Sequence, residues 1–210
     1  MNNKRAAYYQ LLGLSHWERR HPPIQQSSWA FLESCVKQCT ACALHQTRTQ
    51  TVFGVGNKEA RLMIVGEAPG FYEDQQGEPF VGRAGQLLNA MIKSIGFTRN
   101  QVYIANILKC RPPNNRDPLP QEVETCTPFL DQQIQLIKPQ LLLAVGRIAA
   151  HYLLKTKSSL ERLRSQIHHY GDQQIPLIIT YHPAYLLRNP IDKKKAFLDL
   201  QFVKTTLTLS

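Results

Sequence analysis

The chain has 210 residues, enough to bury one substantial hydrophobic core and too few for a second domain of typical size. Its formal net charge of +10 favours a polyanionic partner such as a nucleic acid, or an acidic membrane surface. No apolar run reaches the roughly 18 to 20 residues that span a bilayer, and the start of the chain lacks the apolar core of a signal peptide. We therefore expect a cytoplasmic protein with no membrane segment, and a monomer.

The first thirty residues differ from the rest in composition. They mix aromatic and charged residues and are interrupted at Pro22 and Pro23. We interpret residues 1–30 as a helical extension and residues 31–210 as the globular domain. A second helical pattern starts at Ser27 and leads into the segment that contains Cys39 and Cys42.

Strand and helix patterns alternate in the remaining sequence. Four short runs are rich in branched aliphatic residues, as buried strands of a parallel sheet are: 62–65, 102–107, 141–145 and 177–180. Helical periodicity covers four segments: 84–95, about 121–137, about 148–154 and about 193–207. The alternation predicts an α/β protein, a three-layer α/β/α sandwich around a central, mainly parallel sheet of four strands.

Chemically interesting residues directly follow the predicted strands. The first strand runs into Gly66 and Glu67, the second ends near Asn106, and the last is followed by His182. In open α/β sheets, ligands bind beyond the carboxyl ends of the strands. We therefore expect these residues to converge on one rim.

Five cysteines suggest a metal site rather than disulfides, because their number is odd and the expected compartment is reducing. Cys39 and Cys42 are spaced to bind one metal or cluster, and Cys110 and Cys126 lie near a predicted strand and in the first turn of a predicted helix. Zinc, an iron-sulfur cluster and a set of buried thiols all remain open on these grounds. Cys35 is interpreted as a packing residue.

Several segments, taken together and in order, resemble the family 4 uracil-DNA glycosylases, which are iron-sulfur members of the uracil-DNA glycosylase superfamily. They are CTAC at 39–42, GEAPG at 66–70, GEPFVG at 77–82, YIAN at 103–106, KCRPPNNR at 109–116, Cys126, and HPAYLLRNP at 182–190. The resemblance implies a repair enzyme that hydrolyses the N-glycosidic bond of deoxyuridine in DNA, releases free uracil and leaves an abasic site. It also implies a 4Fe-4S cluster on Cys39, Cys42, Cys110 and Cys126.

A uracil pocket needs a stacking residue, a base-reading residue and a group that stabilises the departing base. The resemblance assigns Phe80 to stacking and Asn106 to reading, since an amide can accept from uracil N3–H and donate to O4. His182 is assigned to the negative charge that develops on uracil O2. The structural alternatives are a core phenylalanine, a loop-capping asparagine and an ordinary loop histidine.

The group that positions water is less well defined. Ala68 stands where better-known members of the superfamily carry an aspartate, which leaves Glu67 and Glu73 as candidate catalytic acids. Glu67 is expected to accept backbone hydrogen bonds or to stabilise the cationic sugar, and Glu73 to orient water or to exclude the methyl group of thymine. Gly66, Ala68 and Asn115 complete the expected substrate-binding set.

The segment after His182 is expected to bind DNA. Tyr185, Leu186 and Leu187 are candidate wedges for the gap that a flipped base leaves, and Arg188 is a candidate phosphate ligand. The alternative is a helix whose leucines face the core. Further positive charge around the rim is expected from Arg83, Lys109, Arg111, Arg116, Arg147 and the lysines at 193–195.

Two other functions fit parts of this pattern. A non-catalytic iron-sulfur module attached to replication or repair machinery would keep the basic surface and the cysteines, without needing Phe80, Asn106 and His182 on one rim. A zinc-dependent RNA- or nucleotide-processing enzyme would not explain that set of residues.

Overall fold

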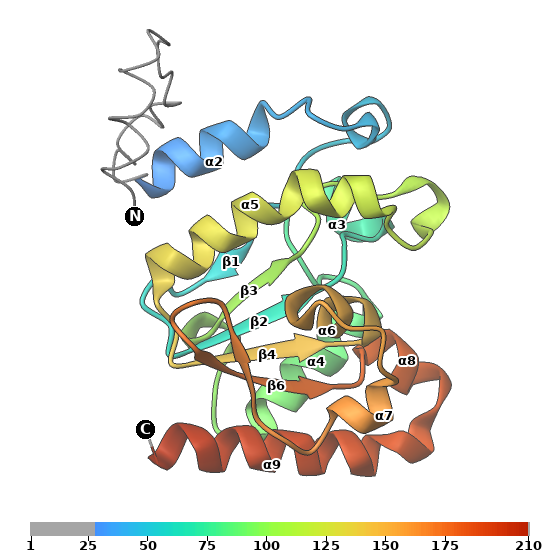
Figure 1. Cartoon of the computed structure of the whole chain (residues 1–210). Helices are drawn as coiled ribbons and strands as arrows, with labels where there is room; N and C mark the ends of the chain where they lie inside the picture. Colours follow the sequence, from blue (N-terminus) through green and yellow to red (C-terminus); the bar gives the residue numbers. More distant parts are fainter. Residues whose placement is uncertain (1–27, 210) are drawn as a thin grey trace, which may run out of the picture.

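The computed structural model describes residues 28–209 and has a six-stranded sheet between two layers of helices (Figure 1). The strands are β1 (Val55–Gly56), β2 (Leu62–Gly66), β3 (Tyr103–Asn106), β4 (Leu141–Val145), β5 (His168–Tyr170) and β6 (Ile175–Thr180). Their order is β1-β3-β2-β4-β6-β5, and only the two edge strands are antiparallel to their neighbours. The predicted α/β/α sandwich is confirmed.

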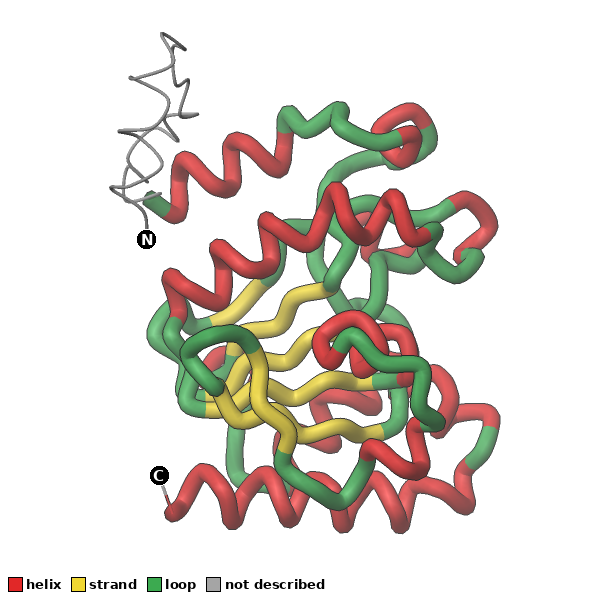
Figure 2. The backbone as a smooth tube through the Cα atoms, viewed as in Figure 1, coloured by secondary structure: helices red, strands yellow, loops and turns green. Residues whose placement is uncertain are grey.

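Helices cover both faces of the sheet (Figure 2). The α-helices are α2 (Trp29–Lys37), α3 (Phe71–Gln76), α4 (Arg83–Ser94), α5 (Pro120–Ile137), α6 (Arg147–Leu154), α7 (Leu160–Leu163), α8 (Pro183–Arg188) and α9 (Lys193–Leu209). Short 3₁₀ turns are η1 (Ala43–Gln46), η2 (Arg99–Gln101), η3 (Pro113–Asn115) and η4 (Pro190–Asp192). Helices α5 and α6 pack on one face, and α4, α8 and α9 on the other.

Two hydrophobic cores follow from the alternation of side chains along the buried strands. In β2, Met63 and Val65 face α5 and α6, whereas Leu62 and Ile64 face α4 and α9. All four are fully buried. Burial on both faces explains why the four central strands are recognisable as continuous apolar runs.

The four predicted strands and the four later helices are confirmed, and the sheet has two edge strands more than predicted. Strands β1 and β5 have only two and three residues and are partly exposed, so they have no apolar run to reveal them. The helix expected from Ser27 is α2, which starts where Ser28 Oγ accepts the N–H of Phe31. The predicted extension lies outside the described residues except for its last three. Within the described part of the chain, no helix has the length and apolar character needed to cross a membrane.

A buried ion pair connects α9 to the sheet. The Asp199 carboxylate, which is fully buried, accepts from Arg164 Nε at 2.8 Å and Nη2 at 3.0 Å. It also accepts from the Thr180 hydroxyl at the end of β6. The Arg164 guanidinium lies over the Tyr181 ring, 4.4 Å from its centroid.

We predict that Asp199→Ala lowers the free energy of unfolding by about 3–5 kcal/mol, because it leaves the buried Arg164 charge with only the exposed Glu161 carboxylate as an ionic partner. Chemical denaturation measures the change. The matched control is Lys195→Ala, which removes only exposed ion pairs and is expected to have a much smaller effect. Equal losses from the two substitutions would contradict the assignment.

Candidate active site and cysteine cluster

A cleft of about 460 Å³ opens at the carboxyl ends of the parallel strands. In Figure 1 the arrowheads of β2, β4 and β6 point toward this edge. The cleft brings together most of the residues singled out in the sequence: Glu67, Ala68, Glu73, Phe80, Asn106, Asn115, His182, Tyr185 and Arg188. Phe80, Asn106 and His182, which come from distant parts of the chain, therefore line one cavity.

Asn106 lines the cleft, and Gly66, which does not line it, lies directly beside Asn106. They are register partners at the ends of β2 and β3. A Cβ atom at residue 66 would lie 2.3 Å from Asn106 Oδ1 and 2.7 Å from the Phe80 ring, so only glycine fits. Among the described residues, Asn106 Oδ1 is the one buried side-chain oxygen or nitrogen that lacks a hydrogen-bond partner. A buried oxygen without a donor is rare in folded proteins, and a bound ligand that donates a hydrogen bond to it would explain its presence here.

Phe80 sits on a turn with unusual backbone geometry. Its φ is 55°, in the left-handed region that a bulky residue rarely occupies. Glu73 Oε1 accepts the N–H groups of Val81 at 3.0 Å and Gly82 at 3.3 Å, and Arg99 donates to the carbonyl of Phe80. Glu73 thus holds the turn that presents Phe80 to the cleft. Accepting backbone hydrogen bonds was one of the roles expected of Glu67, and in the structure Glu73 performs it.

His182 is fixed in one tautomer. Its Nδ1 accepts the N–H of Ala184 at 3.1 Å, so the proton of the neutral ring is on Nε2. Burial, assisted by the charge of Arg188, lowers the pKa of His182 to about 4, and the ring is therefore neutral near pH 7. Its centroid lies 5.6 Å from that of Phe80, with 33° between the ring planes.

Glu67 has a strongly perturbed carboxyl group. Burial raises the pKa of Glu67 to about 7; the negative charge of Asp117 adds to the increase, and Arg147 opposes it. Asp117 and Arg147 form an exposed ion pair at 3.2 Å. The Glu67 carboxylate accepts no hydrogen bond from any described residue.

Two charged residues of the cleft, Arg116 and Asp117, were not among the predicted substrate-binding or catalytic residues. Both directly follow Asn115 in the loop between β3 and α5. Their position next to this predicted site residue is the feature of the sequence that could have identified them. Arg116 forms a bidentate pair with Glu122, at 2.9 and 2.6 Å, and Glu122 also accepts the N–H of Leu119. The loop is thereby fixed to the first turn of α5.

The predicted DNA-binding segment forms helix α8, and this corrects one assignment. Leu186 is 1% exposed and packs in the core against α4 and α9, so it is not available as a wedge. Tyr185 stacks on Tyr181 at 5.1 Å and donates to Asp192, and Leu187 is partly exposed. Arg188 is exposed at the edge of the cleft. Helical periodicity explains the difference, because one leucine of the pair must face the core.

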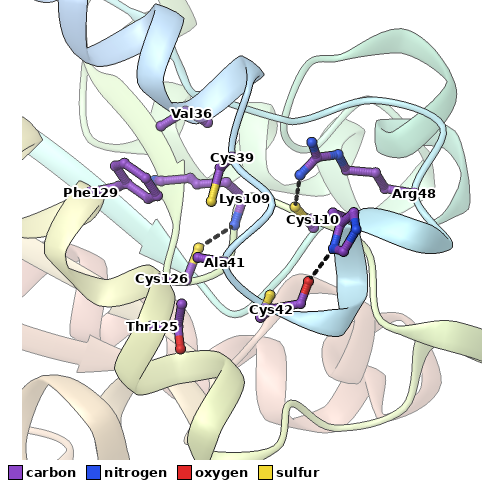
Figure 3. A pocket seen from close by; sticks show the side chains of 11 residues that line it. Val36, Cys39, Ala41, Cys42, Arg48, Lys109, Cys110, Thr125, Cys126 and Phe129 are labelled. Carbon is purple, nitrogen blue, oxygen red and sulfur yellow. Dashed lines mark hydrogen bonds between the residues drawn. The ribbon is translucent and has the colours of Figure 1, made fainter.

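The four cysteines predicted as ligands line one small cavity between the α2–η1 segment and α5 (Figure 3): Cys39, Cys42, Cys110 and Cys126. Cys126 lies in the second turn of α5 rather than the first. Arg48 Nη1 donates to Cys110 Sγ at 3.0 Å, and the backbone N–H of Lys109 donates to Cys126 Sγ at 3.2 Å. Within residues 28–209, no three cysteine, histidine or acidic side chains are arranged to hold a single metal ion.

Lys109 does not contribute charge to the rim, contrary to expectation. It is 1% exposed, and its ammonium donates to the carbonyl of Asn106 at 2.8 Å and to Gln133 Oε1 at 2.6 Å. Gln133 in turn donates to the carbonyl of Phe53. This buried network joins the cysteine cavity to the strand that carries Asn106.

Known proteins resemble this chain over most of its length. Residues 53–202 match the family model of the uracil DNA glycosylase superfamily. The chain is 44% identical to the type-4 uracil-DNA glycosylase of Archaeoglobus fulgidus over 161 residues, 74% of this chain and 81% of the relative. It is 44% identical to the Thermotoga maritima type-4 enzyme over 176 residues (78% and 91%) and 46% identical to that of Sulfurisphaera tokodaii over 162 residues (74% of each).

These similarities cover the strands that form the cleft and confirm the resemblance inferred from the motifs. The chain belongs to the uracil DNA glycosylase superfamily and, within it, to the type-4 uracil-DNA glycosylases.

Proposed function

We propose that this protein hydrolyses the N-glycosidic bond of deoxyuridine in DNA, releasing free uracil and leaving an abasic site for base excision repair. The observation that carries the proposal is the unpartnered Asn106 Oδ1, buried at the floor of a cleft that Phe80 and His182 also line. The names of the type-4 relatives support it. A non-catalytic DNA-binding module would have no use for this arrangement.

Base recognition follows from the donor and acceptor pattern of uracil. We assign Asn106 Oδ1 to accept from N3–H and the Asn106 amide NH₂ to donate to O4. Cytosine has no proton on N3 and carries an amino group at C4, so it presents the reverse pattern. Phe80 is assigned to stack on the ring of the flipped base, from a turn that its hydrogen bonds with Arg99 and the Glu73 carboxylate hold in place.

Bond cleavage is assigned to charge stabilisation on both sides of the breaking bond. The electron pair of the C1′–N1 bond leaves with the base, and His182 Nε2–H donates to O2, where negative charge collects. Glu67, when ionised, is assigned to stabilise the cationic sugar. Water then adds to C1′ and loses a proton, and protonation of the uracil anion balances that loss and completes hydrolysis.

The cysteine cavity is assigned to a 4Fe-4S cluster held by Cys39, Cys42, Cys110 and Cys126. The donor set fits, because the four sulfurs line one cavity and N–H groups of Arg48 and Lys109 donate to two of them. When bound, the cluster supplies a covalent cross-link between the segment after α2 and the β3–α5 region. We assign it no step of the reaction.

The partner is assigned as uracil-containing DNA, bound along a basic rim of the exposed Arg83 and Arg188 and the partly exposed Arg111. We propose that the protein acts as a monomer in the cytoplasm.

Asn106→Ala is predicted to lower kcat/KM for uracil excision by about 10- to 100-fold, the usual effect of losing a bidentate base contact. The melting temperature is expected to change little, since Asn106 Oδ1 has no partner in the folded protein. Excision is measured as alkali-labile sites in an oligonucleotide with one uracil. Absence of cleavage by folded, cluster-loaded wild-type protein would refute the enzymatic assignment.

The Glu67 assignment predicts that kcat/KM rises with pH through about 7, as the carboxyl group ionises. Asp117→Asn should move the inflection to lower pH and Arg147→Gln to higher pH, because these charges respectively raise and lower the pKa of Glu67. Since the folded pKa lies above the unfolded value of 4.5, Glu67 makes stability fall as pH rises from 4.5 to about 7. Glu67→Gln should abolish both effects, and an unchanged activity profile would exclude this role.

Cys110→Ala is expected to remove the visible iron-sulfur absorption band and to lower the iron content, because a cluster ligand is lost. The matched control is Cys35→Ala, since Cys35 is partly buried and does not line the cavity. A colourless wild-type protein that contains zinc would contradict the cluster assignment.

A further inference from the structure

Two adjacent exposed aromatic side chains lie between residues that line the cleft. Phe71 and Tyr72, in the first turn of α3, are 50% and 61% exposed. Their rings meet edge to face, with centroids 5.4 Å apart and 81° between the planes. They lie between Gly70 and Glu73, both of which line the cleft. Neither aromatic ring is needed for the core, so their exposure calls for a partner at this place.

A positive charge accompanies the aromatic pair. The Arg111 guanidinium lies over the Phe71 ring, 5.0 Å from its centroid. Asn115, a cleft-lining residue of the loop between β3 and α5, accepts from Arg111 Nε at 2.7 Å. Arg111 is thus held between the loop and α3, and its remaining N–H groups have no hydrogen-bond acceptor among the described residues.

We propose that Phe71, Tyr72 and Arg111 form a stacking platform for an unpaired nucleotide next to the deoxyuridine. This proposal rests on the proposed function and extends it to the form of the DNA substrate. Phe71 and Tyr72 are flanked in the chain by Gly70 and Glu73, which line the cleft that receives the flipped base. Aromatic rings stack on bases of any sequence, and a guanidinium pairs with phosphate, so the combination suits a single strand.

A base in duplex DNA is less available for stacking on this platform. In a duplex, the neighbouring base is stacked and paired, and freeing it costs a few kcal/mol. A single strand has already lost that pairing, so it gains the full stacking contact. The platform therefore favours uracil in single-stranded or locally opened DNA.

The test is a double-mutant cycle between protein and substrate. Single-stranded oligonucleotides carry one uracil. Either the nucleotide before the uracil or the nucleotide after it is replaced by an abasic tetrahydrofuran. Excision by wild-type protein, Phe71→Ala and Tyr72→Ala is compared. Fluorescence anisotropy with 2′-fluoro-deoxyuridine strands, which resist cleavage, measures the same cycle in binding.

We expect Phe71→Ala and Tyr72→Ala each to lose about 10-fold in kcat/KM and in affinity on the strand without an abasic site. This loss lies within the range that one stacked base contributes. On the strand with an abasic site at the contacted position, the variants and wild type should perform alike. Phe71→Trp should restore the contact. Phe31→Ala, which removes another exposed phenylalanine on α2, should have no effect.

Equal losses on based and abasic strands, or undiminished binding by the variants, would overturn the platform. Failure of the proposed function has a different signature: wild-type protein would excise nothing from any strand. The binding cycle would still decide on the platform in that case.

Discussion

The close approach of β2 and β3 at Gly66 and Asn106 determines the geometry of the cleft. The two residues are paired in register, and no side chain separates them. Any Cβ atom at position 66 would displace both the Asn106 amide and the Phe80 ring. The floor of the site is therefore set by backbone spacing within the sheet, which is among the most rigid distances in a protein.

Several residues of the site adopt locally unfavourable states, and the stability of the rest of the fold offsets their free-energy cost. Phe80 occupies a left-handed backbone conformation, and Asn106 buries an oxygen without a partner. Burial raises the pKa of the Glu67 carboxyl group above its ordinary value. Such departures from local preference are typical of functional sites, and the two continuous cores and the Arg164–Asp199 pair provide stability elsewhere.

Much of this arrangement could be predicted from the sequence, because buried parallel strands and amphipathic helices leave strong periodic signals. Parallel strands also end at one edge, so the meeting of Asn106 and His182 could be expected, and the family resemblance added Phe80 to them. The edge strands, the burial of Leu186 rather than Leu187, and the hydrogen bonds of Glu73 could not, since they depend on contacts between segments rather than on local pattern. The same holds for Lys109, whose burial follows from its partner Gln133 on α5.

The order of the cysteines along the chain has a consequence for biosynthesis. Cys39 and Cys42 precede the sheet, whereas Cys110 follows β3 and Cys126 lies in α5. A growing polypeptide cannot gather all four sulfurs until residue 126 has left the ribosome, but at that moment β4 and β6 are still to come. All four ligands of the assigned cluster can thus be present, and the cluster can be inserted, before His182 has been translated.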